Sequence, residues 1–215
     1  MSKKTWLGIY ILVVFHLVGA IGFFTPLRDW FEWVTPGNLL LCLFVVVFCQ
    51  SRLSVRDNGL LLLVGVLGIL AEIAGVATGL VFGDYSYGAT LGWKIAGVPW
   101  VIGINWALLV WGVLAWLRPL KIGKIRRCAL GATLMVALDF FIEPVAIELD
   151  FWSWAGGDVP LQNYIAWWVL GFLFGLILEF FSSRELEKDW VVKGFFVVQW
   201  LFFIPLFLFL PKGAL

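Results

Sequence analysis

"GLLLLVGVLGILAEIAGVATGLVF", residues 59–82, is an almost unbroken apolar run that contains one acidic residue, Glu72. A helix needs about 20 apolar residues to cross the hydrocarbon core of a bilayer. Six other long apolar runs lie at about 6–24, 32–50, 97–117, 128–149, 161–181 and 191–210. Of the 215 residues, 62% are hydrophobic and only 13% are charged. The sequence therefore predicts an all-α fold, a polytopic membrane helical bundle of about seven transmembrane helices forming one domain, residues 1–215.

Two of these runs have irregular features. The start of the second run is interrupted by Pro36, Gly37 and Asn38. The first run follows Lys3 and Lys4, as the apolar core of a signal peptide would, but it is too long and no small-x-small cleavage site follows, so we expect a helix. The cysteines are odd in number and lie in or beside the runs, so we expect them to be small apolar fillers rather than disulfide partners: Cys42, Cys49 and Cys128.

The distribution of Lys and Arg predicts the orientation in the membrane. With the N-terminus in the cytoplasm, the inner segments carry 12 of these cations and the outer segments carry three, Arg28, Lys94 and Lys212. Cytoplasmic loops are rich in Lys and Arg. We therefore expect an N-in/C-out chain with an odd number of spans. Because topology explains the cations, we expect no nucleic-acid partner.

Few polar side chains fall inside the predicted spans. The ionisable ones are His16, Glu72, Asp139 and Glu143, and Asn105 accompanies them. Each buried charge costs about 2.5–3.5 kcal/mol on insertion scales, so such residues usually face the bundle interior and serve a purpose. With the predicted orientation, all five lie in the outer half of the membrane. The alternative is structural: the acids could form an interhelical hydrogen-bond cluster, with His16 and Asn105 only tying helices together.

Helical spacing indicates which polar groups share a face. Gly68, Glu72, Gly75 and Gly79 form one stripe on which a neighbouring helix can approach closely. Asp139 and Glu143 are four residues apart and also share a face. Two like charges this close in a low dielectric are not both ionised, so one carboxyl would keep its proton beside a carboxylate. The acids at helix ends, Glu148 and Glu179, are expected to be solvated.

Two predicted outer loops resemble each other. "FGDYSYGATLGWKIAGVP" (82–99) and "DFWSWAGGDVPLQN" (150–163) both contain aromatic-Ser-aromatic, then Gly, then Val-Pro. We expect each Val-Pro to open the next helix, because proline suits the first helical turn. Glu72 lies 13 residues before Tyr85 and Asp139 lies 13 residues before Trp152, which suggests that the two acids are counterparts in a diverged repeat. The aromatic residues are either interfacial anchors or the walls of a pocket.

Two motifs carry a resemblance to a known family. The first is Glu72-x-x-Gly75-x-x-Thr78-Gly79-x-x-Phe82-Gly83-x-Tyr85-x-Tyr87, followed by Gly97-Val98-Pro99 and Trp106. The second is Asp139-x-x-x-Glu143-Pro144, then Trp152-x-Trp154, Pro160-x-x-Asn163-Tyr164 and Trp167. From about residue 60 to 180 the chain resembles the integral-membrane carotenoid hydratases, the CruF or bisanhydrobacterioruberin hydratase family. It departs from the family in having Glu143 where Asp precedes the proline, and in a shorter second outer loop.

The resemblance implies a carotenoid 1,2-hydratase (1′,2′ in monocyclic substrates) in a bacterial or archaeal cell membrane. Water would add to the terminal double bond of a lycopene-like or γ-carotene-like end group and give a tertiary alcohol. We expect Asp139 to donate the proton, with Glu143 and Glu72 handling water; these roles could be exchanged. The other motif residues, with Asn105, would bind the substrate: Tyr85, Tyr87, Trp152, Trp154, Asn105, Trp106, Asn163 and Thr78. The implied partners are the polyene, water, lipid and other enzymes of the pathway.

The chemistry of hydration needs no metal or other cofactor, and we expect none. His16 is the only histidine, which argues against a histidine-rich metal site. Three rival functions stay open or are disfavoured. A transporter or proton channel would need polar groups at both membrane depths, and a carotenoid cyclase would need a dry pocket. A retinal-binding protein would need a lysine well inside a helix, whereas Lys193 lies at the edge of the last run.

Overall fold

The computed structural model describes residues 1–49, 54–183 and 189–210, and confirms the all-α fold. Six helices in these ranges are long and apolar enough to cross a membrane, and α4, with 17 residues, is shorter. The seven helices are α1 (Lys3–Gly22), α2 (Arg28–Cys49), α3 (Val55–Thr78), α4 (Val101–Leu117), α5 (Lys124–Glu148), α6 (Leu161–Phe181) and α7 (Trp190–Phe209).

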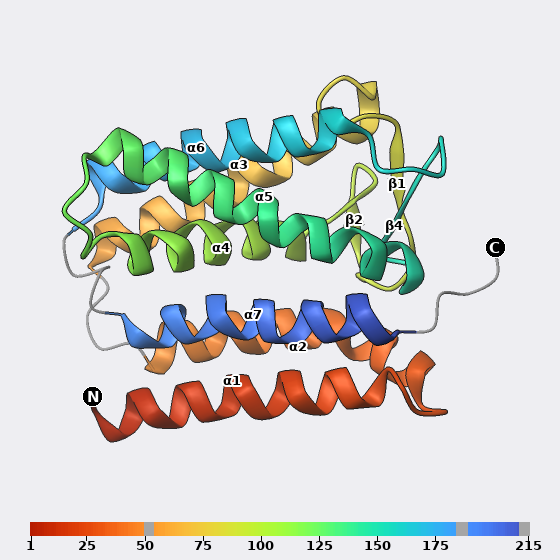
Figure 1. Ribbon diagram of the computed structural model, residues 1–215, viewed down its shortest axis with the longest axis horizontal. Helices are drawn as coiled ribbons and strands as arrows, with labels where there is room; N and C mark the ends of the chain where they lie inside the picture. The colour runs from red at the N-terminus through yellow and green to blue at the C-terminus, as the bar shows by residue number, and fades with distance from the viewer. Residues whose placement is uncertain (50–53, 184–188, 211–215) are drawn as a thin grey trace.

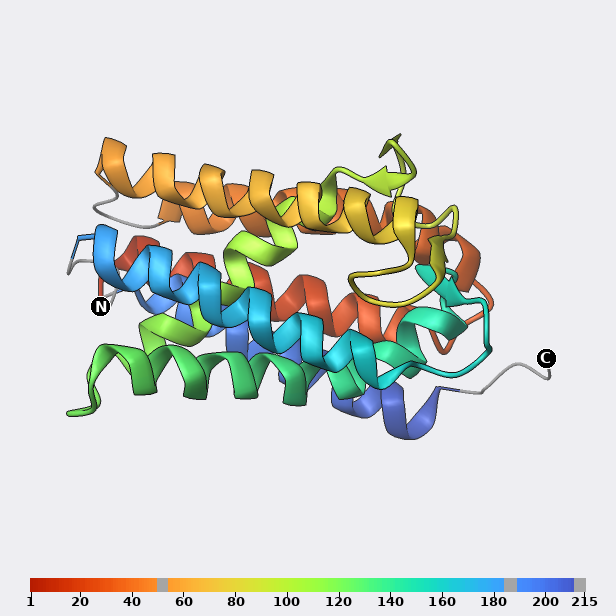
Figure 2. The same cartoon turned by 90° about the horizontal axis from the view of Figure 1, so that it is seen from above.

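The short helix α4 is the centre of the bundle. It packs against α2, α3, α5, α6 and α7, and nearly all of its residues are buried. In Figure 2 it crosses obliquely between the layer that contains α3 and the layer that contains α5 and α6. Because protein rather than lipid surrounds α4, its sequence is apolar on every face.

The start of α1 and the end of α7 lie at opposite ends of the bundle, as an odd number of crossings requires (Figure 1). The N-in orientation itself stays a prediction. Four of the cations on which it depends, Arg52, Arg184, Lys188 and Lys212, lie outside the described residues.

Several predicted helix boundaries are wrong. The interruption expected at Pro36, Gly37 and Asn38 does not occur, because α2 begins at Arg28 and continues through them. The run expected to extend to residue 82 ends as α3 at Thr78, because Gly79 adopts the left-handed conformation (φ 66°) that terminates helices.

Two short antiparallel ribbons lie among the described residues at one end of the bundle. The first pairs β2 (Lys94–Ile95) with β3 (Val98–Pro99). The expectation that Val98–Pro99 opens a helix is therefore wrong, and α4 begins only at Val101. Ala96 (φ 49°) and Gly97 (φ 85°) both have the positive φ that a tight two-residue hairpin turn demands. In the other loop, Pro160 directly precedes α6, as predicted.

The second ribbon joins the two loops that resemble each other. β1 (Tyr85–Tyr87) pairs with β4 (Trp152–Trp154) in the register Tyr85↔Trp154, Ser86↔Ser153 and Tyr87↔Trp152. Side chains alternate between the two faces of a strand. The four aromatic residues therefore point into the bundle, and the two serines point outward and are exposed.

At the opposite end of the bundle, an acidic residue expected to be solvated is buried. Glu179 forms ion pairs with Arg118, at 3.0 Å, and with Arg127. Glu148, also expected to be solvated, pairs with Arg28 at 3.0 Å and is only partly exposed. The cysteines are free and buried, as predicted: Cys42, Cys49 and Cys128.

Candidate active site

The three carboxylates of the predicted site are buried below the β1–β4 ribbon. Glu72 on α3 is 4% exposed, and Asp139 and Glu143 on α5 are 0% and 1% exposed. Glu72 and Glu143 line the same small cavity, whose volume is about 30 Å³. A water molecule needs roughly 10–15 Å³ measured in this way, so the cavity has room for one or two water molecules.

Glu72 is held by phenol and indole groups. Its Oε2 accepts hydrogen bonds from the hydroxyls of Tyr85 (2.5 Å) and Tyr87 (2.9 Å), and its Oε1 accepts one from Trp106 Nε1 (3.0 Å). Trp106 can reach Glu72 because Gly68 leaves room: a Cβ at this glycine would lie 2.8 Å from the indole ring. The predicted glycine stripe thus serves to bring an indole donor to the acid.

Glu143 and Asp139 are joined by one amide. Asn163 Nδ2 donates to Asp139 Oδ2 and to Glu143 Oε1, both at 2.9 Å. Glu143 Oε2 also accepts from Trp152 Nε1 and Trp154 Nε1, each at 2.9 Å. Asp139 Oδ1 is buried and has no hydrogen-bond partner within the described part of the chain. The two carboxyls therefore differ: Glu143 is fully hydrogen-bonded, and Asp139 has one free oxygen.

The ribbon brings the two groups of donors together. Tyr85 lies against Trp154, and Tyr87 against Trp152, with ring centroids 5.1 and 6.0 Å apart. In this arrangement Glu143, not Asp139, is the counterpart of Glu72, because Glu143 receives the donors of the second aromatic pair. The proposed equivalence of Glu72 and Asp139 is wrong in this respect.

The two tyrosines remain hydrogen-bond donors over a wide pH range. Burial raises the pKa of Tyr85 and of Tyr87 above the usual value near 10, and the adjacent Glu72 carboxylate raises both further. Their hydroxyls are therefore neutral at any physiological pH, and each can keep its proton on the side facing Glu72.

Most of the chain, including the helices that carry the carboxylates, matches a known protein family. A profile described as "Carotenoid biosynthesis protein" matches residues 19–212, most of the chain. The chain belongs to the carotenoid biosynthesis protein family. The match confirms the family resemblance and extends it beyond residues 60–180, into α2 and α7.

A known protein gives a second point of comparison. The bisanhydrobacterioruberin hydratase of Haloarcula japonica is 28% identical over 192 residues. The alignment covers 81% of the present chain and 65% of the relative, so the chain spans about two thirds of the relative's length. No solved structure gives a significant match.

Not every residue predicted for the site lies in it. Trp106, Asn163 and Asn105 line the small cavity together with Glu72 and Glu143. Thr78 is exposed at the end of α3, where its hydroxyl donates to Ala74 O and accepts from Leu80 N, so the structure does not bring it to the carboxylates. Three further residues line the small cavity that the sequence did not assign to the site: Phe82 and Trp167, which lie in the two motifs, and Ile102, an ordinary apolar residue of α4.

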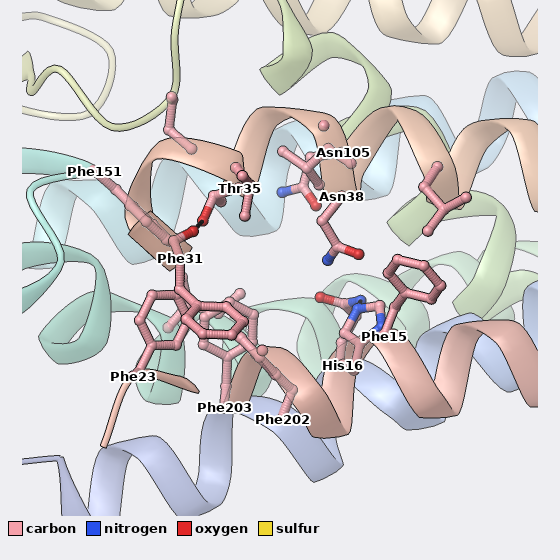
Figure 3. Close-up of a pocket in the computed structure, with 18 of the residues that line it drawn as sticks. Phe15, His16, Phe23, Phe31, Thr35, Asn38, Asn105, Phe151, Phe202 and Phe203 are labelled. Carbon is pink, nitrogen blue, oxygen red and sulfur yellow. Dashed lines mark hydrogen bonds between the residues drawn. The ribbon is translucent and has the colours of Figure 1, made fainter. Parts of the chain in front are cut away.

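A second, larger cavity of about 450 Å³ adjoins the first in this carotenoid biosynthesis protein. Figure 3 shows the rings of Phe23, Phe31, Phe202 and Phe203 gathered toward one side, with Asn38, Asn105 and His16 toward the other. The His16 ring bonds to Leu12 O and, at 3.0 Å, to Gln199 Nε2. His16 is thus a satisfied structural group, which agrees with the alternative raised for it from the sequence.

Proposed function

We propose that this carotenoid biosynthesis protein adds water to the terminal double bond of an acyclic carotenoid end group. The observation that carries the proposal is the meeting of two hydrogen-bonded carboxylates, Glu72 and Glu143, on a cavity of about 30 Å³ that can hold the reacting water. The printed name of the Haloarcula japonica relative, a hydratase, supports the same chemistry.

The acid is the pair formed by Asp139 and Glu143. Two carboxylates that share one amide donor in a buried site would repel each other if both were ionised. Glu143 accepts three N–H hydrogen bonds, which suit a carboxylate, while the free oxygen of Asp139 can carry a proton. Asp139 is not among the residues that line either cavity, whereas Glu143 faces the small one. We therefore assign storage of the proton to Asp139 and its delivery to Glu143.

The steps then balance as follows. A proton passes from Asp139 through Glu143 to C2 of the alkene, whose π electrons form the new C–H bond and leave a tertiary cation at C1. Water attacks C1, and its surplus proton passes to Glu72. That proton returns through cavity water to Glu143 and from Glu143 to Asp139, so the net change is the addition of one water molecule. None of these steps requires a metal, a nucleotide or a redox cofactor.

The aromatic ribbon stabilises the cation. The faces of Tyr85, Tyr87, Trp152 and Trp154 surround the small cavity, and a cation against an aromatic face gains about 0.5–2 kcal/mol per ring. Since their polar atoms are engaged by Glu72 and Glu143, the rings are held in place before the substrate arrives.

The test is expression in a host that makes lycopene or γ-carotene, followed by mass analysis of the extracted pigments. We expect a product heavier by one water molecule, with the oxygen derived from labelled water. The variant Asp139→Asn should give no such product, while Asp158→Asn, which changes an exposed carboxylate of the outer loop, should behave as the parent protein. Retained turnover in Asp139→Asn would remove the assignment.

The same extraction separates the rival functions. A carotenoid cyclase would give a product of unchanged mass, because cyclisation also begins with protonation but adds no water. A transporter or proton channel would give no new pigment at all. The room for water beside Glu72 and Glu143 favours hydration over cyclisation.

A further inference from the structure

The larger cavity has no part in the chemistry described above, yet it adjoins the carboxylates. We propose that it binds the terminal isoprenoid segment of a polyene, which enters from the lipid between α1 and α2. This inference rests on the proposed function and adds to it a binding site for the hydrocarbon, lined mainly by residues of α1, α2 and α7.

The volume and lining of the cavity suit a hydrocarbon chain. Its volume of about 450 Å³ lies within the range of small-molecule sites. A cavity of about 150 Å³ holds one benzene ring, so this one has room for roughly three isoprene units. Its walls are mainly apolar, and the phenylalanines Phe23, Phe31, Phe202 and Phe203 form a chain of edge-to-face contacts. The remainder of a long polyene would stay in the bilayer.

The mouth of the cavity faces lipid. Phe15 and Val18 of α1 and Trp30 of α2 line the cavity, and each is about half exposed. These residues lie on helices long and apolar enough to cross a membrane, so their exposed sides face acyl chains rather than water. A polyene dissolved in the bilayer can therefore enter between α1 and α2 without crossing an aqueous phase.

The inner end of the cavity reaches the carboxylates. Ile102, Asn105 and Trp152 line both cavities, and Trp152 is hydrogen-bonded to Glu143. An end group that fills the larger cavity would place its last carbons beside these three residues. The small cavity, at about 30 Å³, cannot hold the end group in addition to water. The larger cavity thus holds most of the end group and the smaller one holds the water, and the reacting carbons meet the water at the wall that the two cavities share.

The test is a substitution that reduces the volume of the larger cavity and leaves the carboxylates unchanged. A Cβ added at Gly19 would meet only the ring of Phe202, at 3.6 Å, so Gly19→Leu fits the backbone and occupies cavity space. The matched control is Gly59→Leu on α3, where an added Cβ meets nothing within 4 Å and the residue lines neither of the two cavities. We expect Gly19→Leu to raise the KM for the polyene about tenfold or more, as overfilling a hydrophobic site does, and Gly59→Leu to leave it unchanged.

Binding is measured separately in the Asp139→Asn background, where no turnover is expected. The purified protein should carry polyene and show quenched tryptophan fluorescence, and adding Gly19→Leu should abolish both. Equal polyene in the two proteins, or a phospholipid acyl chain in place of polyene, would overturn the inference. If the parent protein adds no water yet Gly19→Leu removes bound polyene, the cavity assignment stands and the hydratase proposal fails.

Discussion

Replacement of Tyr85 and Tyr87 by phenylalanine, singly and together, tests whether Glu72 acts as an oriented carboxylate. Both hydroxyls donate to the same oxygen, Glu72 Oε2, at 2.5 and 2.9 Å. Phenylalanine removes the hydroxyl but keeps the ring, so the contacts of each ring with its cross-strand tryptophan are preserved. The perturbation is therefore confined to the hydrogen bonds of one carboxylate oxygen.

The expected magnitude follows from the sharing of this oxygen. A hydrogen bond to a charged group contributes about 1.5–3 kcal/mol. After one substitution the oxygen still has the other tyrosine, so we expect a loss near the lower limit, about tenfold in rate. After both substitutions Oε2 keeps no donor from the ribbon, and we expect a loss of about a thousandfold or more. The double variant should thus lose more than the product of the single variants.

The assay is the first-order conversion of polyene to its hydrated product in membranes that contain equal amounts of each variant. Tyr10→Phe, on the exposed side of α1, is the matched control and should convert substrate at the parent rate. A double variant within threefold of the parent protein would show that Glu72 does not need these donors, and the role proposed for it as the acceptor of the water proton would be wrong.

The pH dependence of the same assay provides an independent check. Burial, and then the charge of Glu72, raise the pKa values of Tyr85 and Tyr87 above the ordinary value of about 10. A group whose pKa is raised by folding contributes its full stabilisation below its unfolded pKa and loses it only as the pH rises through its folded pKa. Conversion rate and thermal stability should therefore show no loss from tyrosine ionisation up to about pH 10, as followed by tyrosinate absorbance; an earlier loss traced to these residues would contradict their burial.

Two further predictions concern the packing of the bundle. Glu179→Gln removes the charge that a buried carboxylate pairs with two arginines, and should lower the free energy of unfolding by about 3–5 kcal/mol. The control Glu32→Gln loses a partly exposed ion pair and should lower it by less than about 1 kcal/mol. Thermal unfolding in detergent measures both changes. Gly68→Ala should destabilise by about 1–3 kcal/mol and slow conversion, because its Cβ would lie 2.8 Å from Trp106, while Gly59→Ala should do neither.

The helices and the faces that the acids share could be predicted from sequence because both depend on local periodicity. Apolar runs of bilayer length predicted the helices, and the spacing of Asp139 and Glu143 predicted their common face. The convergence of Glu72 and Glu143 on one cavity could also be predicted, because polar side chains within a bilayer face the bundle interior.

The β1–β4 ribbon could not be predicted in the same way, because its strands lie 67 residues apart and neither is long enough to be recognised alone. A signal was nonetheless present. Tyr-Ser-Tyr and Trp-Ser-Trp both alternate with a period of two, which is typical of a strand with one buried face. The larger cavity left no comparable signal, because its wall is assembled from residues spread over five helices, α1, α2, α4, α5 and α7.

The ribbon also explains why the carboxylates differ, which helical spacing alone does not. Helix packing brings Trp106 to Glu72 and Asn163 to the other two acids. The remaining donors all come from the ribbon: two hydroxyls for Glu72 and two indole N–H groups for Glu143. Asp139 lies one helical turn farther from the ribbon than Glu143, beyond the reach of these donors. Its Oδ1 has no hydrogen-bond partner within the described part of the chain. A buried carboxylate needs several donors to stay ionised. The ribbon supplies such donors to Glu72 and Glu143 and none to Asp139, and on this difference we base the proposal that Asp139 stores the proton.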